Sequence, residues 1–390
     1  MTEIIEKIKP IMVFTNDQLH DCVAFLNKSS EISLDLEFDK NRLRYGFNLC
    51  LMQIYCDKKC FIIDPLSKDL DITIVFPVFE NPDIIKIVFA FGEDLRLLLL
   101  LGCRPKNIFD LATLSRLMDY PALSLSNLLL EVTGIESAKS SQLSDWFKRP
   151  LTEKQLNYAV DDVVYLPTIK EAFENEERFQ LISSWFEQES AILETMTYSY
   201  KEDEDAFLKR KDKLKMTEYE WHMYVELMKF RNKTAKSFKR PPHFIMPTEL
   251  VKELVESPSK INDWQNLPRI FKRIKTSTFQ KKISSCVAQA NKVAEEKKLS
   301  KTKGAIPALS IAQKKSNRNK RSLEEKIIKD VFKPIQKELV LKIGANTTNY
   351  IFSNRVIADL VSKTNDLLPY RMKLVEKMGK ELGLEIKDYV

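Results

Sequence analysis

The stretch EISLDLEF, residues 31–38, alternates apolar and polar side chains. Successive side chains of a strand point to opposite faces, so the apolar residues share one face and the other carries Ser33, Asp35 and Glu37. This alternation predicts a strand. Apolar runs at 49–55 and 60–63 predict its neighbours in a sheet, and IIKIVFAF at 84–91 predicts another buried strand that leads into a helix.

Helical patterns surround these strands. Thr15 and Gln18 have the spacing of a capping box, which predicts a helix to about Leu26. Helical patterns dominate from Leu111 onward, including residues 152–175. Strands first, with intervening and trailing helices, predict an α/β fold in which helices cover a mixed sheet.

The strand patterns largely end near residue 190. Two helical blocks of similar size follow, and each has apolar residues at spacings of three and four. We therefore expect an α/β domain, a connecting segment, a small all-α domain, a basic linker and a second all-α domain. Their expected bounds are 1–190, 191–215, 216–294, 295–321 and 322–390.

The net charge of +7 is unevenly distributed along the 390 residues. Between Lys297 and Arg321 there are nine Lys and Arg residues and no Asp or Glu. A polyanion is the obvious partner for such a stretch, although a solvated linker has the same composition.

Several classes of protein are excluded by composition and motif. No run approaches the ~20 apolar residues of a membrane span, and the first residues, MTEIIEKIKPIMVF, make a poor signal peptide. Cys56 and Cys60 form one C-x3-C pair, but no second pair completes a zinc site. No G-x-x-x-x-G-K-[ST] loop occurs, so we expect no nucleotide cofactor. We expect a cytoplasmic protein.

Two pairs of polar residues are candidates for chemistry. Asp35 and Glu37 lie two apart on a predicted strand, and Tyr158 and Asp162 lie four apart on a predicted helix, so each pair shares a face. Either pair alone is more typical of a solvated face. Their combination indicates a function only when the surrounding motifs are considered.

Those motifs resemble the ribonuclease D family of DEDDy exonucleases. The first is LDLEFDKNRLRYGFNLCLMQI (34–54), the second GEDLRLL (92–98) and the third SDWFKRPLTEKQLNYAVDDVVYL (144–166). The resemblance implies a ribonuclease H-like mixed sheet with flanking helices. It also implies a set of catalytic residues: Asp35, Glu37, Asp94, Tyr158 and Asp162.

The same resemblance implies a role for each residue. The four carboxylates are the implied metal ligands, with Asp35 and Asp162 nearest both metals. Tyr158, whose ordinary pKa is near 10, is better suited to orienting the attacking water than to acting as a base. Asp110 matches a supporting position behind the site. Phe89 stands where many relatives carry a histidine, which is a departure in the supporting shell rather than among the ligands.

Four carboxylates in one cluster would repel each other strongly without cations. Two divalent ions ~4 Å apart balance four negative charges and serve in-line phosphodiester hydrolysis. Oxygen ligands favour Mg²⁺ or Mn²⁺ over zinc. We therefore expect two such ions as cofactors.

Residues 219–267 resemble an HRDC domain, a small helical module that binds nucleic acid, and residues 343–361 resemble a second one more weakly. A helical bundle that only packs on the nuclease is the alternative, because a fold does not fix a function. The candidate residues for nucleic-acid binding are Arg231, Lys314, Lys315, Arg318, Lys320 and Arg321.

The resulting expectation is a monomeric 3′→5′ exoribonuclease that acts on RNA with a free 3′ end, including tRNA precursors and other small structured RNAs. Discrimination between RNA and DNA depends on contacts to the 2′-hydroxyl, which no motif here reveals. A DNA 3′→5′ exonuclease of proofreading or repair remains an alternative. A non-catalytic RNA-binding protein is another, against which the intact carboxylate set argues.

Overall fold

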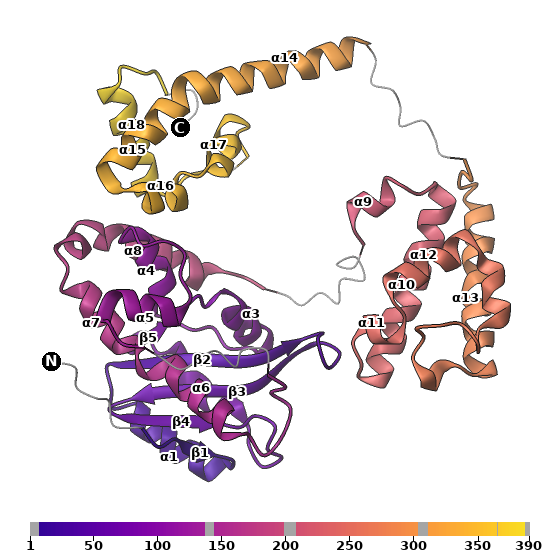
Figure 1. The fold of residues 1–390 in the computed structure, drawn as a ribbon, viewed down its shortest axis with the longest axis horizontal. Coiled ribbons are helices and arrows are strands. Elements are labelled where there is room, and N and C mark those ends of the chain that lie inside the picture. The colour runs from indigo at the N-terminus through magenta and orange to yellow at the C-terminus, as the bar shows by residue number, and fades with distance from the viewer. Residues whose placement is uncertain (1–7, 137–143, 199–207, 303–310, 365, 387–390) are drawn as a thin grey trace. The chain divides into compact units, whose positions relative to one another are not determined.

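A computed structural model describes residues 8–136, 144–198, 208–302, 311–364 and 366–386. Its centre is a sheet with the strand order β1-β4-β3-β2-β5-β6 (Figure 1). β1 is parallel to β4, β4 antiparallel to β3, and β5 parallel to both β2 and β6. The strands are β1 (Ile11–Val13), β2 (Glu31–Lys40), β3 (Phe47–Cys56), β4 (Lys59–Ile63), β5 (Ile85–Val88) and β6 (Ile108–Asp110). The predicted mixed sheet is confirmed.

The helices of this part follow the strands closely in sequence. Thr15 caps the first one by accepting from the Gln18 backbone N–H, while the Gln18 side chain accepts from Phe14 rather than from Thr15. The elements are α1 (Asn16–Leu26), η1 (Ile72–Val75), α2 (Phe76–Glu80), α3 (Gly92–Leu101), α4 (Leu111–Leu117), α5 (Leu125–Thr133), α6 (Glu153–Val164), α7 (Leu166–Glu174) and α8 (Glu177–Thr195).

The two faces of the sheet are covered by different helices. Met12 and Ile62 are paired on neighbouring strands and pack in one apolar cluster with residues of α6. Phe61 points to the other face and its ring lies 5.7 Å from the ring of Phe25 on α1. α1 and α6 therefore lie on opposite faces of the sheet.

The chain divides into two compact units. The second comprises residues 38–48 and 199–309. Its helices surround the fully buried Trp264, whose indole N–H donates to the Ile274 carbonyl at 2.7 Å. They are α9 (Arg210–Lys213), α10 (Glu218–Phe238), α11 (Pro242–Ile245), α12 (Thr248–Glu256), η2 (Pro258–Asp263), η3 (Lys272–Ile274) and α13 (Ser277–Glu296).

The last helices belong to the first unit, with the sheet. They are α14 (Ile311–Ile327), the π-helical turn η4 (Ile328–Phe332), α15 (Lys333–Ile343), α16 (Ala345–Ile351), α17 (Asn354–Val361) and α18 (Pro369–Glu381). One apolar core joins Leu114 and Phe173 of the sheet domain to Phe332 and Ile351 of these helices. The sequence predicted a separate domain for 322–390, but this block shares its core with the sheet domain.

Polar contacts, most of them partly buried, reinforce that shared core. The Asp119 carboxylate accepts from the backbone N–H groups of Asn346 and Thr347 at 2.8 and 3.0 Å, which satisfies the first turn of α16. Arg178 donates to the Ile343 carbonyl at 2.6 Å. Glu189, 5% exposed, accepts from Arg371 at 2.9 Å, so a charge of α8 is paired with one of α18.

Gly344 lies at the closest point of this docking. Its φ of +92° and ψ of 160° belong to a region that is almost restricted to glycine. An added Cβ would lie 1.9 Å from an Asp119 carboxylate oxygen. We expect Gly344→Ala to lower the free energy of unfolding by ~2–4 kcal/mol, because strain of 1–3 kcal/mol adds to the loss of the Asp119 contacts.

Gly383→Ala is the matched control for this change. Gly383 also has a positive φ, +67°, but nothing lies within 4 Å of an added Cβ. Thermal unfolding of both variants separates backbone strain from the clash. Equal losses of stability would contradict the close approach of Gly344 to Asp119.

The predicted basic linker 295–321 differs from the structure at both ends. α13 continues to Glu296, and residues 311–321 form the first part of α14 rather than an irregular segment. Residues 303–310, and residues 199–207 of the predicted connecting segment, lie outside the described residues. Among the described helices, none is long and apolar enough to cross a membrane.

Candidate active site

Three carboxylates meet between the sheet and α6. Asp35 and Glu37 lie on β2 and Asp162 on α6, and one oxygen from each lies within 4.8 Å of the others. Glu37 is buried at 7% exposure, whereas Asp35 and Asp162 are half-buried. Alternation along β2 places both of its acids on one face, as predicted from the sequence, and in the structure this is the face toward Asp162 of α6.

Asp94 adjoins this group from the first turn of α3. It is 8% exposed, and its carboxylate accepts a hydrogen bond from the Leu36 backbone N–H, between Asp35 and Glu37. The positive end of a helix dipole favours an acid at this position. Its charge also acts on Asp35, so all four predicted ligands belong to one electrostatic cluster.

Crowding of these acids changes their protonation. Burial, together with the charges of Asp162, Asp94 and Glu37, raises the pKa of Asp35 well above its usual range. Burial raises the pKa of Asp94 and that of Asp162 to about 7. Protons or cations must therefore neutralise part of the cluster near neutral pH, and its all-oxygen donor set fits hard divalent ions such as Mg²⁺ or Mn²⁺.

Tyr158 is a hydrogen-bond donor to the cluster. Its hydroxyl donates to the Asp162 carboxylate one helical turn away, which favours the charged form of Asp162. Burial and the charges of Asp162, Glu37 and Asp35 raise the pKa of Tyr158 far above 10. The phenol therefore stays protonated at neutral pH and is unsuited to act as a base.

The start of α6 is held by an ion pair between the half-buried Arg149 and the buried Asp64. Arg149 donates to the Asp64 carboxylate at 2.8 Å and to the Cys50 carbonyl at 2.8 Å, which ties the segment before α6 to β3 and to the end of β4. A capping box between Thr152 and Gln155 begins the helix. Sequence reasoning missed this anchor, because Asp64 and Arg149 are far apart in the chain and have no shared spacing.

Asp110 fixes the turn that precedes α3. It accepts from the backbone N–H of Ala90 at 2.8 Å and from that of Ala112 at 2.9 Å. Ala90 has a positive φ of 55°, an uncommon conformation for alanine that this contact stabilises. Phe89 packs against the apolar core beside this turn and adds no polar group there. Asp110 therefore holds the turn before α3, and its charge also raises the pKa of Asp94.

The candidate residues for nucleic-acid binding differ in their exposure to solvent. Arg231 is 3% exposed and donates to the Met246 carbonyl at 3.3 Å and to the Thr248 hydroxyl at 3.0 Å. It joins α10 to α12, so its prediction as a nucleic-acid contact is wrong. Arg318, Lys320 and Arg321 are exposed on α14. The side chains of Lys314 and Lys315 lie outside the described ones.

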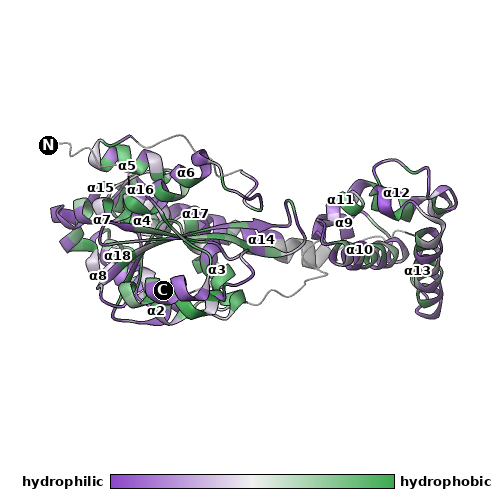
Figure 2. Ribbon diagram, turned by 90° about the horizontal axis from the view of Figure 1, so that it is seen from below, coloured by the Kyte–Doolittle hydropathy of each residue, from purple (hydrophilic) through white to green (hydrophobic). Residues whose placement is uncertain are grey.

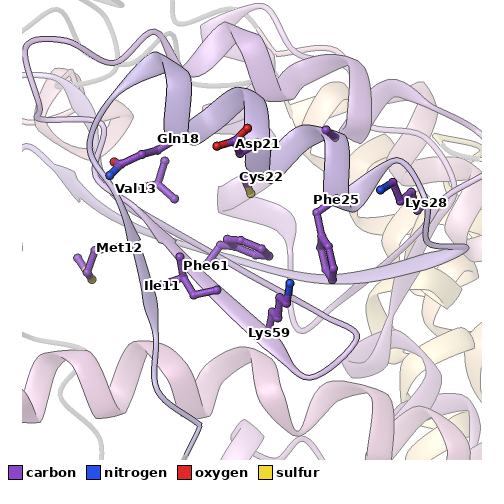
Figure 3. Close-up of a pocket in the computed structure, with 11 residues that line it drawn as sticks. Ile11, Met12, Val13, Gln18, Asp21, Cys22, Phe25, Lys28, Lys59 and Phe61 are labelled. Atoms are coloured by element: carbon purple, nitrogen blue, oxygen red, sulfur yellow. The ribbon is translucent and has the colours of Figure 1, made fainter.

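A cavity of about 410 Å³ lies on the other face of the sheet. It is bounded by α1, β1 and β4, and its lining includes Ile11, Phe25 and Phe61 (Figure 3). The Lys59 ammonium lies 4.1 Å from the centre of the Phe25 ring. The sheet separates this cavity from the four acids, so it takes no part in their chemistry.

Comparison with known proteins gives a family match for the sheet domain and similar proteins for a larger part of the chain. Residues 10–177 match the model of a 3′-5′ exonuclease family. The chain is 29% identical over 264 residues to "Ribonuclease D" of Bartonella henselae, which covers 66% of this chain and 63% of that relative. It is 28% identical over 262 residues to "Exosome complex exonuclease RRP6" of Saccharomyces cerevisiae, covering 63% of this chain and 36% of that relative.

The fold has a counterpart in a solved structure. Escherichia coli RNase D superimposes with a TM-score of 0.68 at 19% identity, over 96% of this chain and 99% of that one. The chain covers less than two thirds of the length of the two curated relatives. Residues 10–177 thus match a 3′-5′ exonuclease family, and the chain is similar in sequence to a ribonuclease D and similar in fold to another.

Proposed function

We propose that this protein is a metal-dependent 3′→5′ exoribonuclease that removes nucleotides one at a time from RNA 3′ ends. The observation that carries this proposal is the cluster of Asp35, Glu37 and Asp162 within 4.8 Å, with Asp94 adjoining it. Such a concentration of buried acid is unfavourable unless a cation balances it. The names of the curated relatives, ribonuclease D and an exosome exonuclease, support RNA as the substrate.

Each residue of the site has a part in this function. The carboxylates of Asp35, Glu37, Asp94 and Asp162 would hold two divalent ions, Mg²⁺ or Mn²⁺. When bound, these ions would supply Lewis acidity and charge neutralisation for in-line hydrolysis. Tyr158 keeps its proton and donates it in a hydrogen bond, so it orients groups at the Asp162 side of the site. Asp110 and Arg149 position α3 and α6.

The finer assignments also rest on the resemblance in the motifs. We propose maturation of tRNA 3′ ends and processing of small structured RNAs as the cellular task, by a monomer in the cytoplasm. The exposed cations of α14, Arg318, Lys320 and Arg321, are proposed to contact the RNA backbone, since phosphate contacts come mainly from Arg and Lys.

Matched single strands of RNA and DNA test the proposal. Each is labelled at its 5′ end and incubated with the protein and Mg²⁺, Mn²⁺ or EDTA. We expect a ladder shortened from the 3′ end on RNA, 5′-monophosphates as products, and no reaction in EDTA. Equal degradation of DNA would instead favour the DNA exonuclease, and binding without hydrolysis of either strand would favour the non-catalytic alternative.

Removal of metal should make stability depend on pH. The pKa values of Asp94 and Asp162 are about 7 in the folded chain, above the ordinary value of 3.8. The folded state therefore binds more protons than the unfolded state between these values, and its stability falls as the pH rises. In EDTA we expect melting to occur at least ~2 °C higher at pH 6 than at pH 8, which is ~1 kcal/mol for a domain of this size.

Bound metal should oppose the loss of stability at higher pH. Mg²⁺ or Mn²⁺ competes with protons for the same oxygens, so it should raise the melting temperature more at pH 8 than at pH 6. Asp94→Asn, which removes one titrating ligand, should flatten the pH dependence in EDTA and reduce the response to metal. Identical melting curves at both pH values in EDTA would contradict the raised pKa values.

A further inference from the structure

The second unit contains a long segment without negative charge. Residues 264–294, which include η3 and most of α13, carry seven Lys and Arg residues and no Asp or Glu. Figure 2 shows that the outer side of α13 is mainly hydrophilic. This positive segment is a different part of the sequence from the basic stretch 297–321, and it was not among the predicted binding residues.

Three aromatic side chains cluster beside these cations. The Phe238 ring, at the end of α10, lies 5.4 Å from that of Phe271 and 5.8 Å from that of Phe279 in the first turn of α13. All three rings are half-buried at the rim of the apolar core of the unit. Each therefore packs on one side and keeps part of its surface in solvent.

Each of the three rings has basic residues close to it in the sequence. Lys239 and Arg240 follow Phe238, Lys272 and Arg273 follow Phe271, and Lys282 places its ammonium 5.0 Å from the centre of the Phe279 ring. Within the described part of the chain none of these five forms an ion pair, whereas the nearby Arg269 pairs with Glu253 at 3.1 Å. Unpaired cations around aromatic rings remain available to an anion.

The start of α13 adds to the same potential. Phe279 is the third residue of this 20-residue helix, whose first turn contains no acid. A helix N-terminus carries partial positive charge, which favours phosphate; here the Phe279 N–H donates to the Thr276 hydroxyl, and the charge of the helix end remains. The rings, the side-chain cations and this helix end thus coincide.

We propose that this aromatic–basic face binds single-stranded RNA, with bases against the rings and phosphates at the cations. The face consists of Phe238, Lys239, Arg240, Phe271, Lys272, Arg273, Lys275, Phe279, Lys281 and Lys282. Aromatic rings next to a positive track are the means by which single strands are held without sequence preference. An acidic protein surface would pair with the cations, but it has no bases to stack on the rings.

This inference rests on the proposed exoribonuclease function, because it assumes that the RNA held here is the substrate. It also replaces Arg231, which is buried in the same unit, with residues that solvent can reach. The RNA contact of the second unit is therefore assigned to η3 and the start of α13.

Charge removal tests the phosphate contacts. Binding of the full chain to a 12-nucleotide single-stranded RNA is measured in EDTA at several salt concentrations for Lys272→Gln/Arg273→Gln/Lys281→Gln/Lys282→Gln. Each lost contact should reduce the slope of log K against log salt by about 0.7. We expect the slope to fall by ~1.4–2.8 for two to four lost contacts.

A control variant removes the same charge elsewhere in the unit. Lys209→Gln/Arg210→Gln/Lys211→Gln/Lys215→Gln changes four exposed cations in and beside α9. Its slope should change by less than one contact, about 0.7. Equal slopes for the two variants would overturn the proposal, since the loss would then reflect total charge only.

Ring removal tests the base contacts. In Phe271→Leu/Phe279→Leu, leucine preserves apolar packing but offers no face for stacking. RNA binding should weaken by about 5- to 150-fold, the equivalent of 1–3 kcal/mol of stacking, with the salt slope unchanged. Binding of polyglutamate should be unaffected. Two results together would overturn the proposal: the variant binds RNA as tightly as the wild type, and polyglutamate competes for the face as well as RNA of equal charge does. The face would then be assigned to an acidic protein.

Failure of this inference can be distinguished from failure of the proposed function. If RNA binds with the expected slope and ring dependence but no nucleotide is released in Mg²⁺ or Mn²⁺, the RNA-binding face stands and the exonuclease proposal fails. If RNA is degraded while both face variants bind and act like the wild type, the exonuclease proposal stands and the face is overturned.

Discussion

Asp35→Asn should reduce RNA hydrolysis at least about a hundredfold, because even the outer partners of metal ligands typically cost 10- to 100-fold when removed. Asp35 is the acid on which the charges of Asp162, Asp94 and Glu37 all act. The change keeps the shape of the side chain and removes its charge, so the fold and RNA binding should be retained. Single-turnover hydrolysis in Mg²⁺ measures the loss.

Asp161→Asn is the control for this variant. Asp161 precedes Asp162 on α6 but does not belong to the three-carboxylate group. It should keep turnover near the wild-type value. If Asp35→Asn kept more than a tenth of wild-type turnover, or if both variants lost activity equally, the assignment of the metal site would be wrong.

Tyr158→Phe should slow the chemical step by roughly one to three orders of magnitude, the range expected for one positioned proton-linked group. The ring remains in place next to Trp146, whose ring centre is 6.0 Å away, so packing is preserved. Metal affinity should barely change, because the tyrosine is a donor to Asp162 and not a proposed ligand.

Tyr165→Phe makes the same chemical change one residue past the end of α6. It should leave the single-turnover rate unchanged. Rates that are equal to the wild type in both variants would show that Tyr158 has only a packing role. A loss of metal affinity in Tyr158→Phe would contradict its assignment as a donor.

The two long strands could be predicted because each shows a recognisable pattern, alternation in β2 and an apolar run in β3. β2 carries ten residues, and its alternation also predicted that Asp35 and Glu37 would share a face. β1 and β6 contain three residues each, too few for any alternation to be recognised, and both were missed. The pairing of β1 with β4 depends on distant parts of the chain, which local patterns do not encode.

The site was predictable only in part for the same reason. Residues two or four apart reveal a shared face, which brought out Asp35 with Glu37 and Tyr158 with Asp162. Asp94 could be placed only through its resemblance to a family motif. Arg149 and Asp64 lie on segments that meet only after folding, so no spacing reveals their ion pair.

The final helical block shows another limit. Its spacing of apolar residues predicted helices correctly, but an apolar stripe does not specify what it packs against. Phe332 and Ile351 could equally have formed the core of a separate domain. In the structure they share a core with Leu114 and Phe173, far earlier in the chain.

That shared core has a consequence for the order of synthesis. A ribosome releases the acids of the active site long before it releases the helices that complete their supporting core. Until Phe332 and the residues after it have emerged, the apolar surface around Phe173 stays uncovered, so the nascent nuclease remains incomplete. A message truncated in the stretch before α14 would therefore yield a chain with every proposed ligand and an unfinished body, which protein quality control could recognise by its exposed apolar surface.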